Sequence, residues 1–194
     1  MAASVRLRQA AAICLGWFVI SSAPAQTKAL PPPAYQLAAH EAGIPSVVLY
    51  AVALQESGIN LRGKRIPWPW TLNVAGKPRR FRNPVAACAH LQGALLEVPA
   101  KRIDVGLGQI NAGYHAHRVE HPCDLLDPYK NLTVAATILH EQHRSGEDWL
   151  AAIGRYHRPA GGAPAARYRR SVHQHLSRLH GYPSSLADPR RSYP

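Results

Sequence analysis

Glu56 has the position in this sequence that best suits acid–base chemistry. It lies near the end of the apolar segment 45–57, and helical spacing places it on the same face as Val52 and Ala53. In the last turn of such a helix, the helix dipole disfavours a negative charge. Burial and the dipole both raise the pKa of a carboxyl group, and an acid protonated near neutral pH can donate its proton during glycosidic cleavage. The position alone leaves open a Glu turned outward or paired with an arginine.

Histidine is abundant in the chain, with eleven copies, but its spacing does not define a metal site. The segment His140-Glu141-Gln142-His143 differs from the zinc motif HExxH, because that motif needs histidines four residues apart and position 144 is Arg. The remaining histidines are too scattered to complete a ligand set. We therefore expect no metal ion and no other cofactor.

The length and composition predict a single folded domain, and the pattern along the chain predicts a mainly helical one. The chain has 194 residues, of which 46% are hydrophobic, which is enough for a sizeable core and excludes wholesale disorder. Its 17 prolines and 14 glycines exclude a long coiled coil. The net charge of +12 could suit nucleic acid, but no recognition module is apparent, so nucleic acid is not an expected partner.

Proline, glycine and N-capping residues indicate where the helices begin and end. The expected helices are 35–42, 45–57, 83–97, 127–145, 147–156 and 167–179. Residues 70–74 and 78–81 are expected to form a small β-hairpin around the turn 75–77. Trp68 and Trp70 near this hairpin could stack on sugar rings, or one or both could anchor the hairpin against the core.

Both ends of the chain are expected to lie outside the domain. Arg6 and Arg8, the apolar run 10–20 and the Ala-x-Ala site 23–25 predict that residues 1–25 are a signal peptide. An uncleaved membrane anchor is the alternative; after cleavage we expect a periplasmic protein without stable membrane insertion. Residues 26–33 are expected to be a linker, residues 34–182 the domain, and residues 183–194 a disordered basic tail.

Two cysteines, Cys88 and Cys123, remain after removal of the signal peptide. In an oxidising compartment, two cysteines indicate one disulfide. Two unpaired buried thiols are the alternative.

Four sequence blocks together resemble the lytic transglycosylases with an SLT (soluble lysozyme-like) domain. The first is Ala53–Gly58, which contains Glu56, and the others follow in the family's order: Asp104–Asn111, Asp127–Leu132 and Ile153–His157. The resemblance implies a goose-type lysozyme-like helical fold with a small β-hairpin insert. It is closest to the subgroup that accompanies conjugation and type IV secretion machines, because of the segment 69–76.

The resemblance implies an activity on peptidoglycan glycan strands. Glu56 would protonate the oxygen that joins N-acetylmuramic acid to N-acetylglucosamine, and would then take the proton of the muramic C6 hydroxyl as this attacks the anomeric carbon. The product ends in a 1,6-anhydro sugar, and no second carboxylate is needed to activate water, unlike in hydrolysing glycosidases. A lysozyme-like hydrolase and an inactive peptidoglycan-binding scaffold are the alternatives. The basic surface would attract the anionic wall.

The resemblance also implies roles for residues around Glu56. Tyr156 would orient the catalytic acid through its hydroxyl. Asp104 would have a structural or loop-capping role, and activation of a water molecule is the alternative. The residues expected to bind substrate are Ser57, Trp70, Gly106, Leu107, Gln109, Asn111 and Tyr156. The chain departs from the family pattern at two positions: Gly108 replaces the usual Met that floors the site, and His157 replaces the usual Asn.

Overall fold

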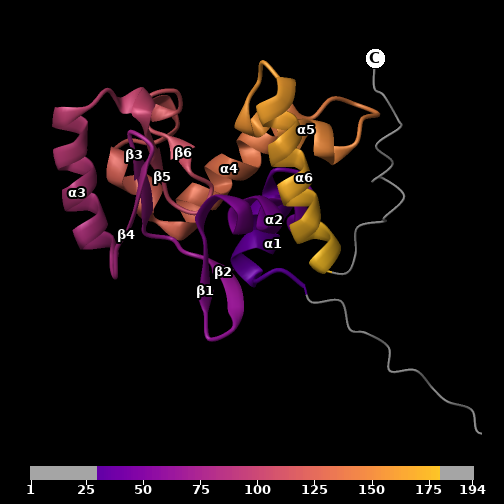
Figure 1. Ribbon diagram of the computed structural model, residues 1–194, viewed down its shortest axis with the longest axis horizontal. Helices are drawn as coiled ribbons and strands as arrows, with labels where there is room; N and C mark the ends of the chain where they lie inside the picture. The colour runs from indigo at the N-terminus through magenta and orange to yellow at the C-terminus, as the bar shows by residue number, and fades with distance from the viewer. Residues whose placement is uncertain (1–29, 180–194) are drawn as a thin grey trace, which may run out of the picture.

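Helix α2 (Ser46–Ser57) lies at the centre of residues 30–179, the part of the chain that this computed structural model describes (Figure 1). It is apolar on nearly every side, and residues such as Val48 and Leu49 are fully buried. A helix of this composition is stable only inside a core. The helices that pack against α2 are α1 (Pro33–Glu41), α4 (Pro128–Gln142) and α6 (Gly162–Arg178).

The other elements complete two sides of the molecule. Figure 1 shows α3 on the left beside a four-stranded sheet, with α1, α2, α5 and α6 on the right and α4 reaching between them. Helix α3 spans Pro84–Glu97 and α5 spans Trp149–His157. Short 3₁₀ helices span Ala100–Arg102, Ala116–Arg118 and Pro122–Leu126. The mainly helical fold class is therefore confirmed.

The strands form two antiparallel sheets. A hairpin of β1 (Gly58–Leu61) and β2 (Lys64–Pro67) follows α2 directly. The larger sheet has the order β4-β3-β5-β6. Its strands are β3 (Thr71–Val74), β4 (Lys77–Arg80), β5 (Ile103–Val105) and β6 (Ile110–Asn111). The expected hairpin is confirmed as β3–β4, with Thr71 paired to Arg80.

Three of the strand pairings were not expected from the sequence. The β1–β2 turn consists of Arg62 and Gly63, both at positive φ (49° and 76°). Gly63 suits this conformation, but Arg62 does not indicate it, because few residues other than glycine are found there. Strands β5 and β6 have only 3 and 2 residues. Such short strands depend on their neighbours and not on a local pattern: β5 pairs with β3, and β6 pairs with β5.

Helix α6 begins earlier than expected. The Gly- and Pro-containing segment before Arg167 was expected to be a loop, but the helix begins at Gly162. Pro164 falls in its first turn, where a backbone N–H has no partner within the helix, so proline is tolerated there. The end of α2 at Gly58 was expected, but the reason differs. Gly58 has an extended conformation at φ −60°, and a Cβ there would lie 2.2 Å from the carbonyl oxygen of Leu54.

The expected signal peptide (1–25), the first part of the linker and the expected tail (183–194) lie outside the described residues. Within residues 30–179, no single helix has the length and apolar composition needed to cross a membrane. Helices α1 and α2 meet that test only when taken together across a bend of 117°.

A disulfide joins Cys88 of α3 to Cys123 in the 3₁₀ helix that precedes α4, with 5.3 Å between the Cα atoms. It therefore ties the outer helix α3 to the segment that leads into the core helix α4. The bond closes a loop with a sequence separation of 35 residues.

Replacing both cysteines by alanine is expected to lower the free energy of unfolding by about 3 kcal/mol, because the unfolded chain regains the entropy of an open loop. Urea denaturation of the double variant and of the parent measures this difference. Reduction of the parent with dithiothreitol should reproduce it. A loss below about 1 kcal/mol in both experiments would contradict the expectation.

Candidate active site

A groove of about 980 Å³ lies between the four-stranded sheet and the helices α2, α4 and α5. Glu56 reaches it from the last turn of α2, where the chain turns into β1. The other lining residues come from the sheet, from the segment after β6, from α4 and from the end of α5. They are Thr71, Asn73, Gly76, Pro78, Arg80, Asp104, Gln109, Ile110, Asn111, Tyr114, His115, Ile138, Tyr156, His157, Arg158, Pro159 and Ala160.

Glu56 is half-buried as a residue, and it lines this groove. Burial raises its pKa from 4.5 to about 7, because the charged form loses hydration. The hydrogen bond from Tyr168 acts in the opposite direction, and the negative charge of Asp104 raises the pKa further. The group can therefore be protonated near neutral pH and still act as a base after it has given up its proton.

Tyr168 is the residue that holds this carboxyl group. Its hydroxyl donates a hydrogen bond of 2.5 Å to Oε1 of Glu56, across a sequence separation of 112 residues. Sequence reasoning missed Tyr168, since it falls in a strongly basic segment with no recognised block. A signal was nonetheless present: Tyr168 shares one helical face with Val172 and Leu176, and all three are buried.

Replacing Tyr168 by phenylalanine is expected to raise the pKa of Glu56, because the hydrogen bond favours the charged carboxylate. A ¹³C NMR titration of the Glu56 side-chain carboxyl measures this. The midpoint should move to higher pH than in the parent. The control is Tyr50→Phe, which removes a hydroxyl group at another position of α2, the helix that carries Glu56. It should leave the midpoint at the same pH as in the parent. A midpoint at lower pH in the Tyr168 variant would show that the hydroxyl favours the protonated acid.

Tyr156 lies beside the carboxyl group but makes a different contact from the one expected. Its hydroxyl donates to the carbonyl oxygen of Gly108 over 2.7 Å. Burial raises the pKa of Tyr156 well above its usual value, and the charge of Glu56 raises it further, so this hydroxyl keeps its proton. The hydroxyl that donates directly to Glu56 therefore belongs to Tyr168, and Tyr156 supports the loop that faces it.

The space around Gly108 explains the absence of a larger side chain there. A Cβ at this position would lie 2.8 Å from Cβ of Ala135 and 2.9 Å from the hydroxyl oxygen of Tyr156. Tyr156 and Ala135 therefore take up the space that the Met expected here from the resemblance would need. His157, the second departure, stacks its ring on that of Tyr168 with 4.4 Å between centroids. It thereby packs against the residue that holds Glu56.

The loop 106–109 is fastened to the core from two sides. Ser57 is fully buried, and its hydroxyl donates to the carbonyl oxygen of Leu107 over 2.8 Å. Asn131 of α4 accepts from the backbone N–H of Gly108 and donates to the carbonyl oxygens of Val105 and Leu125. We expected Ser57 and Leu107 to bind substrate, but both side chains are buried inside the protein.

Gly106 also allows the loop 106–109 to pack against the core. It has φ 80°, and a Cβ there would lie 2.2 Å from Nδ2 of Asn131. The glycine is therefore required for the approach of the loop to Asn131, and its own backbone is buried away from the groove.

The amides of Gln109 and Asn111 do line the groove, as expected, and their N–H groups hold its wall together. Gln109 donates to the carbonyl oxygens of Thr71 and Gly106. Asn111 donates to Oδ1 of Asp104 over 2.8 Å, while Asn73 donates to the other carboxylate oxygen over 3.3 Å.

Asp104 is the second acidic residue of the groove. Burial raises its pKa, and the hydrogen bonds from Asn111 and Asn73 counteract that shift. The expected structural role fits these bonds, but the structure also brings this carboxyl group into the groove of Glu56. The two acids come from separate sequence blocks, and the tertiary structure brings them to one groove.

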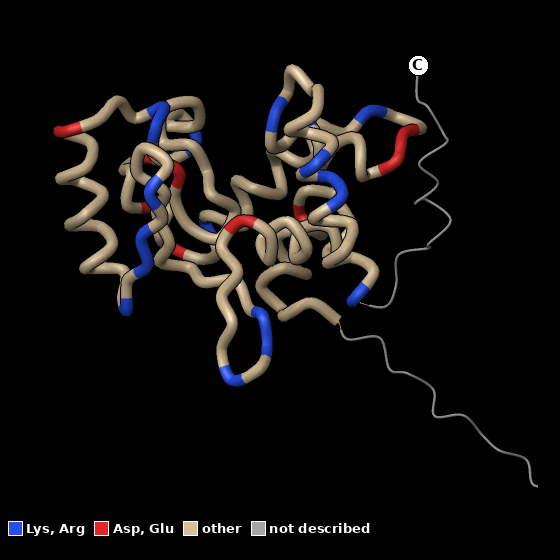
Figure 2. Tube along the Cα trace, viewed as in Figure 1, with Lys and Arg blue, Asp and Glu red and all other residues tan. Residues whose placement is uncertain are grey.

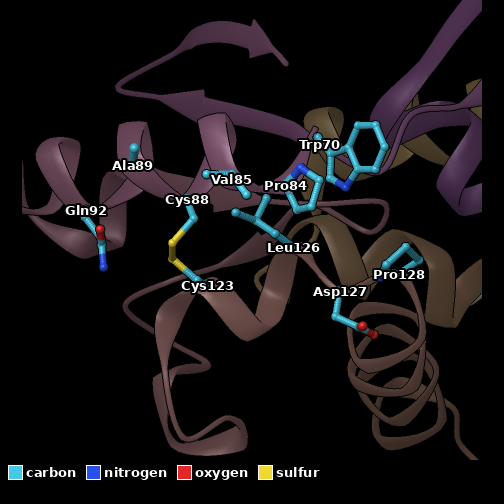
Figure 3. A pocket seen from close by; sticks show the side chains of 10 residues that line it. All are labelled: Trp70, Pro84, Val85, Cys88, Ala89, Gln92, Cys123, Leu126, Asp127 and Pro128. Atoms are coloured by element: carbon cyan, nitrogen blue, oxygen red, sulfur yellow. A yellow bond between two sulfur atoms is a disulfide. The ribbon is translucent and has the colours of Figure 1, made fainter. Parts of the chain in front are cut away.

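Trp70 does not line this groove. Figure 3 shows it close to Pro84 at a different pocket, whose lining also includes Leu126 and both disulfide cysteines. The volume of this pocket is about 540 Å³. It packs edge-to-face on Trp68 with 5.6 Å between ring centroids, and Trp68 in turn donates to the carbonyl oxygen of Phe81. The alternative in which these tryptophans anchor the hairpin fits this placement better than sugar stacking beside Glu56.

Within residues 30–179, His, Cys, Asp and Glu side chains do not gather in groups of three or more that could hold a metal ion. The polar side chains of the groove offer hydroxyl, amide, carboxyl, imidazole and guanidinium groups, which suit sugar recognition and proton transfer.

Comparison with known proteins supports a family relationship. The family model described as "Transglycosylase SLT domain" matches residues 33–179, which include every residue of the groove. Searches of curated proteins and of solved structures found no significant match.

Proposed function

This chain belongs to the transglycosylase SLT domain family, and from that membership we propose that it cleaves the β-1,4 bond between N-acetylmuramic acid and N-acetylglucosamine in peptidoglycan. The family comprises lytic transglycosylases. The observation that carries the proposal is the half-buried Glu56 in the groove floor, with a pKa of about 7 and a hydrogen bond from Tyr168.

In the proposed reaction Glu56 acts twice. It first donates its proton to the oxygen of the glycosidic bond, and the bond to the anomeric carbon breaks. The resulting carboxylate takes the proton of the muramic C6 hydroxyl, whose oxygen forms a new bond to the anomeric carbon. A pKa near the working pH suits a group that must both give and take a proton. Tyr168 holds the carboxyl group throughout and helps to stabilise its charged form.

Hydrolysis is the second candidate, and the position of Asp104 favours it. This carboxyl group lines the same groove as Glu56, where it could position a water molecule for attack on the anomeric carbon. Both of its oxygens already accept hydrogen bonds from Asn111 and Asn73, which fits a structural role and makes hydrolysis the weaker proposal.

Mass spectrometry of the fragments released from purified sacculi distinguishes these reactions. Transglycosylation leaves 1,6-anhydro ends, whereas hydrolysis leaves reducing ends that are heavier by one water. We expect anhydro ends. Reducing ends alone would assign the chain as a hydrolase, and binding without any release would assign it as an inactive scaffold.

We further propose that the protein acts in the periplasm and opens the wall locally for a conjugation or type IV secretion machine. The support for export is the expected signal peptide at residues 1–25, and the support for the machine is the resemblance of segment 69–76, part of which forms β3. Fractionation of cells that express the full chain tests the location.

A further inference from the structure

Two arginines on different elements face the groove from its rim. Strand β4 carries the first of them. Residues of a strand alternate between its two faces, and on β4 Pro78 and Arg80 line the groove, whereas Lys77 and Arg79 line a separate pocket on the side of α3. Figure 2 shows basic positions along β4, and only Arg80 among them belongs to the groove.

Arg158 is the second arginine, and it directly follows α5 in the connection to α6. Both guanidinium groups belong to exposed residues. The ion pairs within residues 30–179 are Arg118–Glu141, Lys130–Asp124 and Arg155–Glu147, so neither Arg80 nor Arg158 is neutralised by one of them. Positive charge therefore flanks a groove whose own acids, Glu56 and Asp104, are withdrawn into its floor and wall.

The proposed substrate carries matching groups. Each N-acetylmuramic acid bears a peptide stem on its lactyl group, next to the bond that is cut, and the stem has free carboxylates. Arginine binds carboxylates through two parallel N–H bonds and retains its charge at any physiological pH. In a strand that carries its stems, the lactyl carboxyl is consumed in the amide bond to the peptide, so the free carboxylates belong to the stem.

We propose that Arg80 and Arg158 bind the carboxylates of the peptide stem, so that this groove prefers peptidoglycan whose stem carboxylates are free over peptidoglycan whose stem carboxylates are amidated. This inference rests on the proposed function, since it places peptidoglycan in the groove. It extends that proposal by naming the form of the substrate and two residues that determine the preference.

The test measures binding separately from turnover. The full chain carrying Glu56→Gln, which is not expected to cut the polymer, is cosedimented with sacculi that lack attached wall polymers. A second batch of the same sacculi has its carboxylates converted to amides with carbodiimide and ammonia. We expect amidation to weaken binding by about tenfold, since each exposed charge pair contributes a few-fold in affinity. When Arg80→Gln and Arg158→Gln are added to the Glu56→Gln protein, amidation of the sacculi should change its affinity by less than about twofold.

The matched control removes the same two charges elsewhere. The control protein carries Arg79→Gln and Arg170→Gln. Arg79 lies on the other face of β4, and Arg170 is an exposed residue of α6. This pair should retain the full response to amidation. Equal loss of the response in the control pair would show a diffuse attraction between a basic protein and an acidic polymer, and would overturn the proposal. An unchanged affinity of the parent for amidated sacculi would also overturn it.

Turnover by the chain with Glu56 intact reports on the proposed function alone. Release of anhydro fragments from amidated sacculi supports the enzymatic proposal even if the binding preference is absent. Failure to release fragments from either batch contradicts the enzymatic proposal, while the cosedimentation result still decides the role of the two arginines.

Discussion

Turnover of purified sacculi is expected to fall by about 10²–10⁴-fold when Glu56 is replaced by glutamine, which is the usual contribution of a positioned acid or base. Glutamine keeps the shape of the side chain and can still accept the hydrogen bond of Tyr168, but it has no proton to donate and cannot take one back. The measurement is the initial rate of soluble fragment release, followed by chromatography. Activity within about threefold of the parent would exclude the acid–base role of Glu56.

The control is Glu97→Gln, which makes the same change at an exposed glutamate in the last turn of α3. Its rate should match that of the parent. The stability of the Glu56 variant provides a second check. Because the folded-state pKa of Glu56 is raised, the stability that its protonated form contributes is present below about pH 4.5 and is lost as the pH rises through about 7. Glutamine carries no charge at any pH, so the variant should be at least as stable as the parent at pH 8.

Replacing Asn131 by leucine is expected to lower the free energy of unfolding by about 4 kcal/mol, because buried polar groups that lose their partners cost about 1–3 kcal/mol each. The side chain of Asn131 is 1% exposed and makes three hydrogen bonds, with Gly108, Val105 and Leu125. Leucine has a similar volume but satisfies none of these backbone groups. Urea denaturation measures the loss.

The same variant should also lose activity at temperatures where it remains folded. The loop 106–109 carries the carbonyl oxygen that accepts from Tyr156, so its release would disturb the groove wall next to Glu56. Thr133→Ala, at an exposed position on the same helix, should change stability by no more than about 0.5 kcal/mol. If leucine at position 131 left both stability and turnover unchanged, Asn131 would not be what holds the loop.

Local sequence signals predicted the helices well. Asn83 caps α3 by accepting from the N–H of Ala86, and Asp127 caps α4 by accepting from that of Lys130. These capping signals act over three or four residues, so the sequence displays them directly. The early start of α6 shows where local reasoning failed, because Pro164 indicates a loop unless the helix is already known to begin just before it.

The candidate site was predicted in part. The place of Glu56 on its own helix indicated burial, which is a local property, and the resemblance of the block Ala53–Gly58 made it the expected acid. Gln109 and Asn111 do line the groove, while Ser57, Gly106 and Leu107 are buried and hold its wall in place. A sequence block can show that a segment matters, but it does not distinguish a side chain that faces substrate from one that holds the loop behind it.

The sequence by itself determined the helical elements and the acid on α2, because helix periodicity, caps and a charged residue on an apolar face depend on neighbours within one turn. The tertiary structure decided which hydroxyl reaches that acid, which carboxyl group shares its groove, and that Trp70 lies elsewhere. Tyr168 and Glu56 are separated by 112 residues. Contact between them exists only after α6 packs on α2, and a packing arrangement is a property of the whole core that no local pattern specifies.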